Sequence, residues 1–124
     1  MADKKYRVGI VGLSGITTGT DGALEKTNVG QDGQSPLKRQ LITSHSACLS
    51  LMRDVEVVGY CDLADDPLDN FKNTWGNVWP SAKPFYDYKE MLHSQNLDIL
   101  TVATGDDKHS QIVIDGANSG VKGI

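Results

Sequence analysis

Apolar positions along the chain fall into short runs with strand character. Residues 6–12, 55–61 ("VEVVGYC") and 97–104 ("LDILTVAT") are rich in β-branched residues, and Val8, Ile10 and Val11 are apolar on both faces of the first run. Such runs are typical of parallel strands buried on both sides of a sheet. A further short strand is expected at 83–86, and residues 121–124 read as the start of another.

The segments between these strands have apolar residues at helical spacing. Apolar residues recur three and four positions apart over 37–52, which predicts a helix. Further helices are expected at 67–76, at 87–95, and at 106–120 with Ile112, Val113 and Ala117 facing inward. This alternation predicts an α/β fold: a Rossmann-type, doubly wound parallel sheet in a three-layer α/β/α arrangement, formed by one domain over residues 1–124 that is expected to be incomplete.

Residues 17–36 interrupt the pattern, because they are rich in glycine and carry no apolar period. We interpret them as an inserted loop. The helix that follows then has two possible starts, one capped by Thr43 or Ser44 and one capped by Ser35 with Pro36 as its first residue. The loop could form a flap over a ligand or a mobile surface segment.

Composition excludes several classes of function. The 124 residues carry a net charge of −4 without a basic stripe, so nucleic acid is not an expected partner. No apolar run approaches the roughly 18 residues that a membrane span needs. Cys48 and Cys61 show no disulfide framework, which favours reduced thiols and a cytoplasmic protein. His45 and Cys48 lack the paired spacing of a zinc site, so no metal is expected. His45 is instead expected to pack on the inner face of its helix.

The stretch "YRVGIVGLSGI" (6–16) joins the first strand to a glycine-rich turn. Such turns let backbone N–H groups approach a pyrophosphate, because glycine has no Cβ to block the approach. Aligned to G-x-G-x-x-G, Gly12 takes the tight-turn position, whereas Ser14 and Thr17 replace the later glycines and Gly15 is additional. Taken alone, the stretch fits an ordinary glycine turn equally well.

Asp62 ends the second strand, where a carboxylate can accept hydrogen bonds from the adenosine ribose. It lies farther from the glycines than the about 20 residues of the dinucleotide fingerprint, and the insertion accounts for the difference. No basic residue follows directly, which favours NAD over NADP. The alternative is a solvated acid in the acidic stretch "DLADDP".

The fourth strand ends in "VATGDDKH" (102–109), which is expected to border the same crevice. Thr104 and Gly105 can lay backbone against the cofactor. Asp106 is expected to cap the next helix and Asp107 to suit its N-terminal dipole. His109 is expected to make a structural hydrogen bond, and Trp75 and Trp79 to be packing residues.

Three segments together resemble the N-terminal half of the Gfo/Idh/MocA oxidoreductases: "YRVGIVGLSGI", "HSACLSLMRDVEVVGYCD" and "PFYDYKEMLHSQNLDILTVATGDDKHSQIVIDGANSGVKGI". The resemblance covers nearly the whole chain apart from 17–43. The family commonly has Ala-Thr-Pro-Asn-x-x-His where this chain has Ala103-Thr104-Gly105-Asp106-Asp107-Lys108-His109, which leaves the nicotinamide contacts open.

The resemblance implies an NAD(P)-binding domain of a dehydrogenase that transfers hydride between nicotinamide and a sugar- or polyol-like substrate. It also implies that the substrate domain and the lysine of the family's Glu-Lys-Pro motif are absent from this chain, which would bind cofactor without catalysing. A non-catalytic dinucleotide-sensing or scaffold domain and a methyltransferase-like domain that binds S-adenosylmethionine remain alternatives.

The expected partners are NAD, with NADP possible, and a sugar or polyol only together with the missing domain; a homo-oligomer is possible. No catalytic residue is expected in the chain. The residues expected to bind the cofactor are Gly12, Ser14, Gly15, Ile16, Asp62, Leu63, Thr104, Gly105, Asp106 and His109.

Overall fold

The computed structural model describes residues 4–19 and 44–124 of the chain. Their strands form one four-stranded sheet in the order β3-β2-β1-β4, and every pairing is parallel. The strands are β1 (Tyr6–Val11), β2 (Val55–Cys61), β3 (Lys83–Phe85) and β4 (Ile99–Val102). The parallel α/β sheet predicted from the sequence is therefore confirmed.

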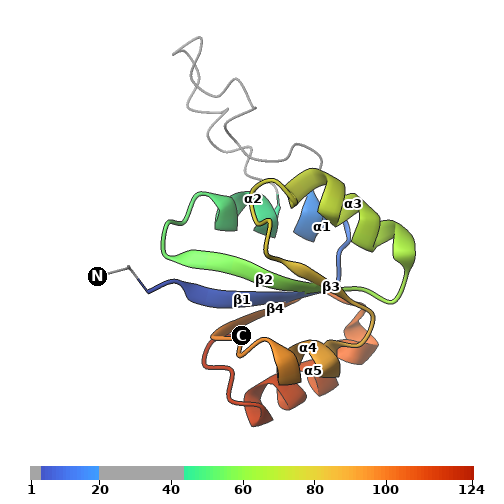
Figure 1. The fold of residues 1–124 in the computed structure, drawn as a ribbon. Helices are drawn as coiled ribbons and strands as arrows, with labels where there is room; N and C mark the ends of the chain where they lie inside the picture. Colours follow the sequence, from blue (N-terminus) through green and yellow to red (C-terminus); the bar gives the residue numbers. More distant parts are fainter. Residues whose placement is uncertain (1–3, 20–43) are drawn as a thin grey trace, which may run out of the picture.

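Helices cover both faces of this sheet (Figure 1). On one face lie α1 (Gly15–Thr18), α2 (His45–Ser50) and α3 (Asp65–Trp75). On the other lie α4 (Tyr88–Ser94) and α5 (Asp106–Asn118). The predicted three-layer arrangement is confirmed, and the carboxyl ends of the parallel strands all reach the same edge.

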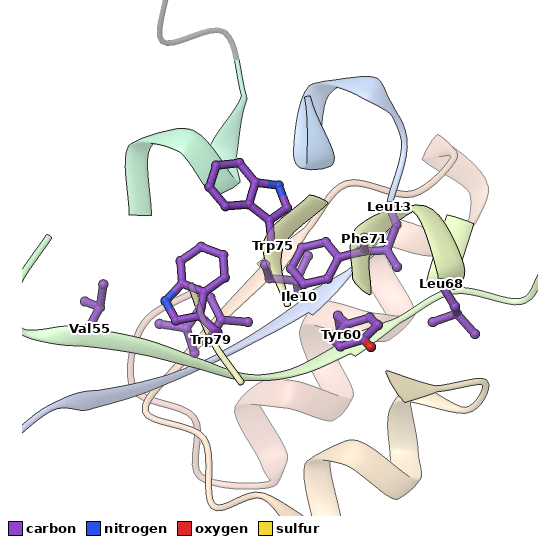
Figure 2. Close-up of a cluster of buried hydrophobic side chains, with 10 residues drawn as sticks. Ile10, Leu13, Val55, Tyr60, Leu68, Phe71, Trp75 and Trp79 are labelled. Carbon is purple, nitrogen blue, oxygen red and sulfur yellow. The ribbon is translucent and has the colours of Figure 1, made fainter. Parts of the chain in front are cut away.

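Each face of the sheet has its own apolar core, because successive side chains of a strand point to opposite faces. Val8 and Ile10 of β1 belong to the core under α3, and Val11 belongs to the core under α4 and α5. Aromatic rings fill the first core (Figure 2): Phe71 stacks on Tyr60 with ring centroids 4.4 Å apart.

Trp75 and Trp79 are packing residues, as predicted. Trp75 is 1% exposed and Trp79 is 6% exposed, with ring centroids 5.3 Å apart. The Trp75 indole nitrogen donates a 2.7 Å hydrogen bond to the carbonyl oxygen of Thr18, the last residue of α1. Figure 2 shows that indole nitrogen directed toward α1. This bond attaches α1 to α3, although α1 is only four residues long.

The prediction of one helix over 37–52 is wrong, because Ser44 is extended (φ −130°, ψ 155°) and breaks any helix there. The Ser44 hydroxyl instead accepts a 3.1 Å hydrogen bond from the Ala47 N–H and caps α2. The expected start near residues 43–45 is thereby confirmed, and the rival start at Ser35 and Pro36 lies outside the described residues. His45, which was expected to pack inward, is exposed, whereas Ser46 is buried.

The boundary proposed for the inserted loop at residue 17 is also wrong. Thr17 and Thr18 are helical and buried, so the regular fold continues to Gly19. Gly19 has φ +69°, and a Cβ added there would lie 2.8 Å from the Ser44 hydroxyl oxygen. Residues 19 and 44 therefore lie side by side. The rest of the expected loop, and the flap that it could form, lie outside the described residues.

The C-terminal part differs from the expectation within α5 and agrees with it after residue 120. Ile112 of α5 faces inward as predicted, but Val113 and Ala117 are exposed. Gly116 takes the inward position because it follows Ile112 by one helical turn. A strand after residue 120 has begun: Gly123 forms a parallel bridge with Ile99, and its carbonyl accepts a 2.8 Å hydrogen bond from the Leu100 N–H.

Replacement of Trp75 by phenylalanine should destabilise the protein by about 2–3 kcal/mol, because it leaves the buried Thr18 carbonyl without its donor and opens a small cavity. Urea unfolding followed by circular dichroism at 222 nm measures the loss. Trp79→Phe is the matched control, since the Trp79 indole makes no hydrogen bond within the described part of the chain. An equal or larger loss in Trp79→Phe would contradict the assigned role of the Trp75–Thr18 bond.

Candidate functional site

A cavity of about 730 Å³ lies at the edge where β1, β2 and β4 end. In parallel α/β sheets this edge is the usual place for ligands. The lining comes from the turn after β1, the ends of β2 and β3, the first residue of α4, and the β4–α5 connection with the first turns of α5. The lining residues are Val11, Gly12, Leu13, Ser14, Cys61, Asp62, Leu63, Tyr86, Tyr88, Ala103, Thr104, Gly105, Asp107, Lys108, Gln111 and Ile112.

The turn after β1 requires glycine at its first position. Gly12 has φ +93°, and a Cβ added there would lie 2.4 Å from the Ala103 carbonyl oxygen. No other residue fits this close approach of the β1 and β4 ends without a shift of the backbone. Gly15 differs, because a Cβ added there would meet nothing within 4 Å among the described residues.

The Asp62 carboxylate meets this turn directly. Its Oδ2 accepts a 3.1 Å hydrogen bond from the Leu13 N–H, and its Oδ1 accepts a 3.2 Å hydrogen bond from the Ala64 N–H. The glycine turn and the acid after β2 therefore face one cavity, as the sequence predicted, although they lie far apart along the chain. A carboxylate oxygen can accept more than one hydrogen bond, so Asp62 retains capacity for a ligand hydroxyl.

The β4–α5 connection supplies Thr104 and Gly105 to the same cavity. Asp106 was expected to cap α5, and this is wrong. The helix begins one residue earlier than that assignment requires, so Gly105 occupies the N-cap position and Asp106 is the first helical residue. Asp106 and Asp107 both lie in the first turn, where a negative charge suits the helix dipole.

Four of the residues expected to bind a cofactor do not line the cavity: Gly15, Ile16, Asp106 and His109. Ile16 is 55% exposed. The His109 Nε2 is buried and has no hydrogen-bond partner among the described residues, so the structural hydrogen bond expected of this histidine is not made at Nε2. The other six, Gly12, Ser14, Asp62, Leu63, Thr104 and Gly105, are brought together.

Two lining tyrosines were not among the expected site residues. Tyr86 follows β3 and donates from its hydroxyl to the Asp65 carboxylate, which raises the pKa of Tyr86. Tyr88 begins α4 and donates to Asp115 Oδ2 at 2.5 Å, a bond that raises the pKa of Tyr88 to about 12. The signal in the sequence was "YDYKEML" directly after a strand, since residues after parallel strands share one edge.

Cys61 ends β2 inside the cavity lining and is buried. Burial, together with the nearby carboxylates of Asp62 and Asp87, raises the pKa of the Cys61 thiol to about 12. The thiol is therefore protonated near neutral pH, which makes it a poor nucleophile and a poor metal ligand.

The described residues form neither a metal-binding cluster nor a membrane-spanning helix. Over residues 4–19 and 44–124, no group of three or more histidine, cysteine, aspartate or glutamate side chains is arranged to hold a metal ion. Within the same ranges, no helix combines the length and apolar character needed to cross a membrane.

Several solved dehydrogenase structures share this fold. The WlbA dehydrogenase from Bordetella pertussis, in complex with NADH and UDP-GlcNAcA, is 24% identical with a TM-score of 0.58, over 99% of this chain and 28% of that chain. The scyllo-inositol dehydrogenase from Lactobacillus casei is 17% identical with a TM-score of 0.64, over 99% and 28%. The myo-inositol dehydrogenase from Lactobacillus casei, in complex with NAD(H) and myo-inositol, is 16% identical with a TM-score of 0.60, over 94% and 26%.

These likenesses show the fold, so the Rossmann-type domain predicted from the sequence is confirmed. The chain spans between 26% and 28% of the length of these three dehydrogenases. No protein-family model matches the sequence, and no curated protein matches it.

In the native protein at pH 8, a disulfide reagent such as DTNB should label Cys48 promptly and Cys61 at least about 100-fold more slowly, because Cys61 is buried and its thiolate is scarce. Absorbance at 412 nm follows the reaction. Urea should make both thiols react, and Cys48→Ser should leave one slow thiol. Prompt labelling of the remaining thiol in folded Cys48→Ser would contradict this description of Cys61.

Proposed function

We propose that this chain is the NAD-binding domain of an oxidoreductase of the Gfo/Idh/MocA type. The observation that carries the proposal is the 3.1 Å hydrogen bond from the Leu13 N–H to Asp62 Oδ2. It places a glycine-rich turn suited to a pyrophosphate beside a carboxylate suited to ribose hydroxyls, at the mouth of one cavity. The fold likeness to dehydrogenases crystallised with NADH or NAD(H) supports the same conclusion.

The residues present fit a dinucleotide. The backbone N–H groups of the turn after β1 would face the pyrophosphate, and Gly12 keeps the turn tight. Asp62 would hold the adenosine ribose, with Leu63 next to it, and Thr104 and Gly105 would lie along the cofactor from the β4 side. Ser14 lines the cavity as well. The other expected cofactor-binding residues do not line it, so a contact with the cofactor would require the cofactor to extend beyond the cavity: Gly15, Ile16, Asp106 and His109. The cavity of about 730 Å³ lies within the size range of small-molecule and cofactor sites.

Asp62 gives the site a preference for NAD over NADP. The carboxylate would repel the negatively charged 2′-phosphate of NADP. Neither of the next two residues, Leu63 and Ala64, is basic, so neither would offset this repulsion. Both Asp62 oxygens already accept backbone hydrogen bonds, so the carboxylate is fixed in position and cannot turn away from such a phosphate at no cost.

When bound, the nicotinamide ring supplies the hydride acceptor or donor. The residues of this chain bind and orient the cofactor, and we assign no proton transfer to any of them. A sugar- or polyol-like substrate would be bound by a second domain outside these residues. The compounds bound in two solved neighbours support this class of substrate: UDP-GlcNAcA in one and myo-inositol in the other. The free thiols of Cys48 and Cys61 fit a cytoplasmic protein.

The Asp62→Ala variant should bind NADH about tenfold more weakly, because the ribose loses its charged acceptor. NADPH affinity should stay level or rise, because the charge that repels the 2′-phosphate is gone. Titration of the 124-residue chain with NADH, NADPH and S-adenosylmethionine, followed by nicotinamide fluorescence or calorimetry, measures these affinities.

The ratio of NADH to NADPH affinity is the decisive quantity, since damage to the turn alone would weaken both cofactors together. Asp66→Ala is the matched control: Asp66 lies in the first turn of α3, is exposed and does not line the cavity. It should leave the ratio unchanged. Binding of S-adenosylmethionine without binding of either dinucleotide would overturn the proposed function.

A further inference from the structure

One wall of the cavity carries a hydrogen-bonded network that joins α4 to α5. The Tyr88 hydroxyl donates to Asp115 Oδ2 at 2.5 Å, and the Gln111 side-chain Nε2 donates to Asp115 Oδ1 at 2.9 Å. Tyr88 and Gln111 line the cavity, whereas Asp115 does not. The two hydrogen bonds lower the pKa of Asp115, which keeps it ionised near neutral pH.

This network fixes which end of the Gln111 amide is available to a ligand. An ionised carboxylate only accepts hydrogen bonds, so the amide must present its NH₂ group to Asp115. The carbonyl oxygen Oε1 of Gln111 is then the end of the amide that remains available to a ligand. Among the residues that the structure describes, none donates a hydrogen bond to it. Gln111 and Asp115 lie one helical turn apart on α5, a spacing at which such pairs form readily.

The position of this acceptor within the cavity matters for a dinucleotide. If Asp62 holds the adenosine ribose and the turn after β1 holds the phosphate, the adenine base must also find a position in the cavity. On the β3 side of β2 the lining includes Tyr86 and Tyr88. The hydrogen bonds of Tyr88 and Gln111 to the same Asp115 carboxylate bring Gln111 of α5 close to Tyr88. Tyrosine rings offer flat apolar surface to a base, and Gln111 offers the acceptor.

We propose that Gln111 Oε1 accepts a hydrogen bond from the exocyclic amino group of adenine, and that Asp115 is the residue that positions it. The inference rests on the proposed function and adds base specificity to the same site. Adenine presents a donor at its C6 position. Hypoxanthine has a carbonyl group at C6. Its oxygen would face Gln111 Oε1, and two acceptors cannot form a hydrogen bond with each other. The site would therefore select the adenine dinucleotide over its deaminated analogue.

The test compares NADH with reduced nicotinamide hypoxanthine dinucleotide, whose nicotinamide half is identical. The 124-residue chain should bind NADH about tenfold more tightly, a modest factor because Gln111 is exposed to water. Gln111→Ala should lose this preference. Asp115→Asn should reduce it, because an amide partner no longer dictates which end of Gln111 faces the ligand. Asn118→Ala is the matched control on α5, since Asn118 is exposed and outside the lining, and it should keep the preference.

The outcomes separate this inference from the proposal on which it rests. Equal affinity for the two dinucleotides in the unmodified chain, or a preference that persists in Gln111→Ala, would overturn the adenine contact and leave the dinucleotide site standing. An unchanged preference in Asp115→Asn would overturn the positioning role. Failure of the chain to bind either dinucleotide would overturn the proposed function and this inference with it.

Discussion

The register between β1 and β2 is the constraint on which the site depends. Val11 pairs with Cys61, and the Gly12 N–H donates a 2.9 Å hydrogen bond to the Cys61 carbonyl. Parallel pairing makes both strands end at one edge, so the residues that follow, Leu13 and Asp62, must meet there. Their 3.1 Å hydrogen bond follows from this register and in turn fixes the carboxylate against the turn. A one-residue slip would carry Asp62 out of reach and reverse the faces of every β2 side chain.

The two described segments that flank residues 20–43 are held close together where they end. Gly19 and Ser44 lie next to one another, since a Cβ added to Gly19 would lie 2.8 Å from the Ser44 hydroxyl oxygen. The Trp75 indole N–H donates to the Thr18 carbonyl and so fixes the end of α1. The Ser44 hydroxyl accepts from the Ala47 N–H and caps the start of α2.

The sequence was sufficient for features set by local pattern and strand order. Apolar runs identified the strands, and glycine followed by an acid after the next strand identified the shared edge. Features set by tertiary contact were not accessible in the same way. The Gly-Ile-Thr-Thr turn of α1 has weak helix propensity and is held by Trp75 from another helix. Asp106 was a plausible cap by residue type, but the chain enters α5 one residue earlier. Tyr88 and Gln111 share a wall only because α4 and α5 pack on the same face.

The central claim is that a dinucleotide occupies the cavity between the turn after β1 and the carboxylate of Asp62. Nuclear magnetic resonance of the ¹⁵N-labelled chain tests it most directly, through amide shifts followed as NAD is added. We expect the largest changes at the amides of Leu13, Ser14 and Ala64. The Leu13 and Ala64 N–H groups donate to the Asp62 carboxylate, and Ser14 lies in the turn. Shifts confined to the opposite end of the sheet, near Tyr6 and Val55 where β1 and β2 begin, would contradict it.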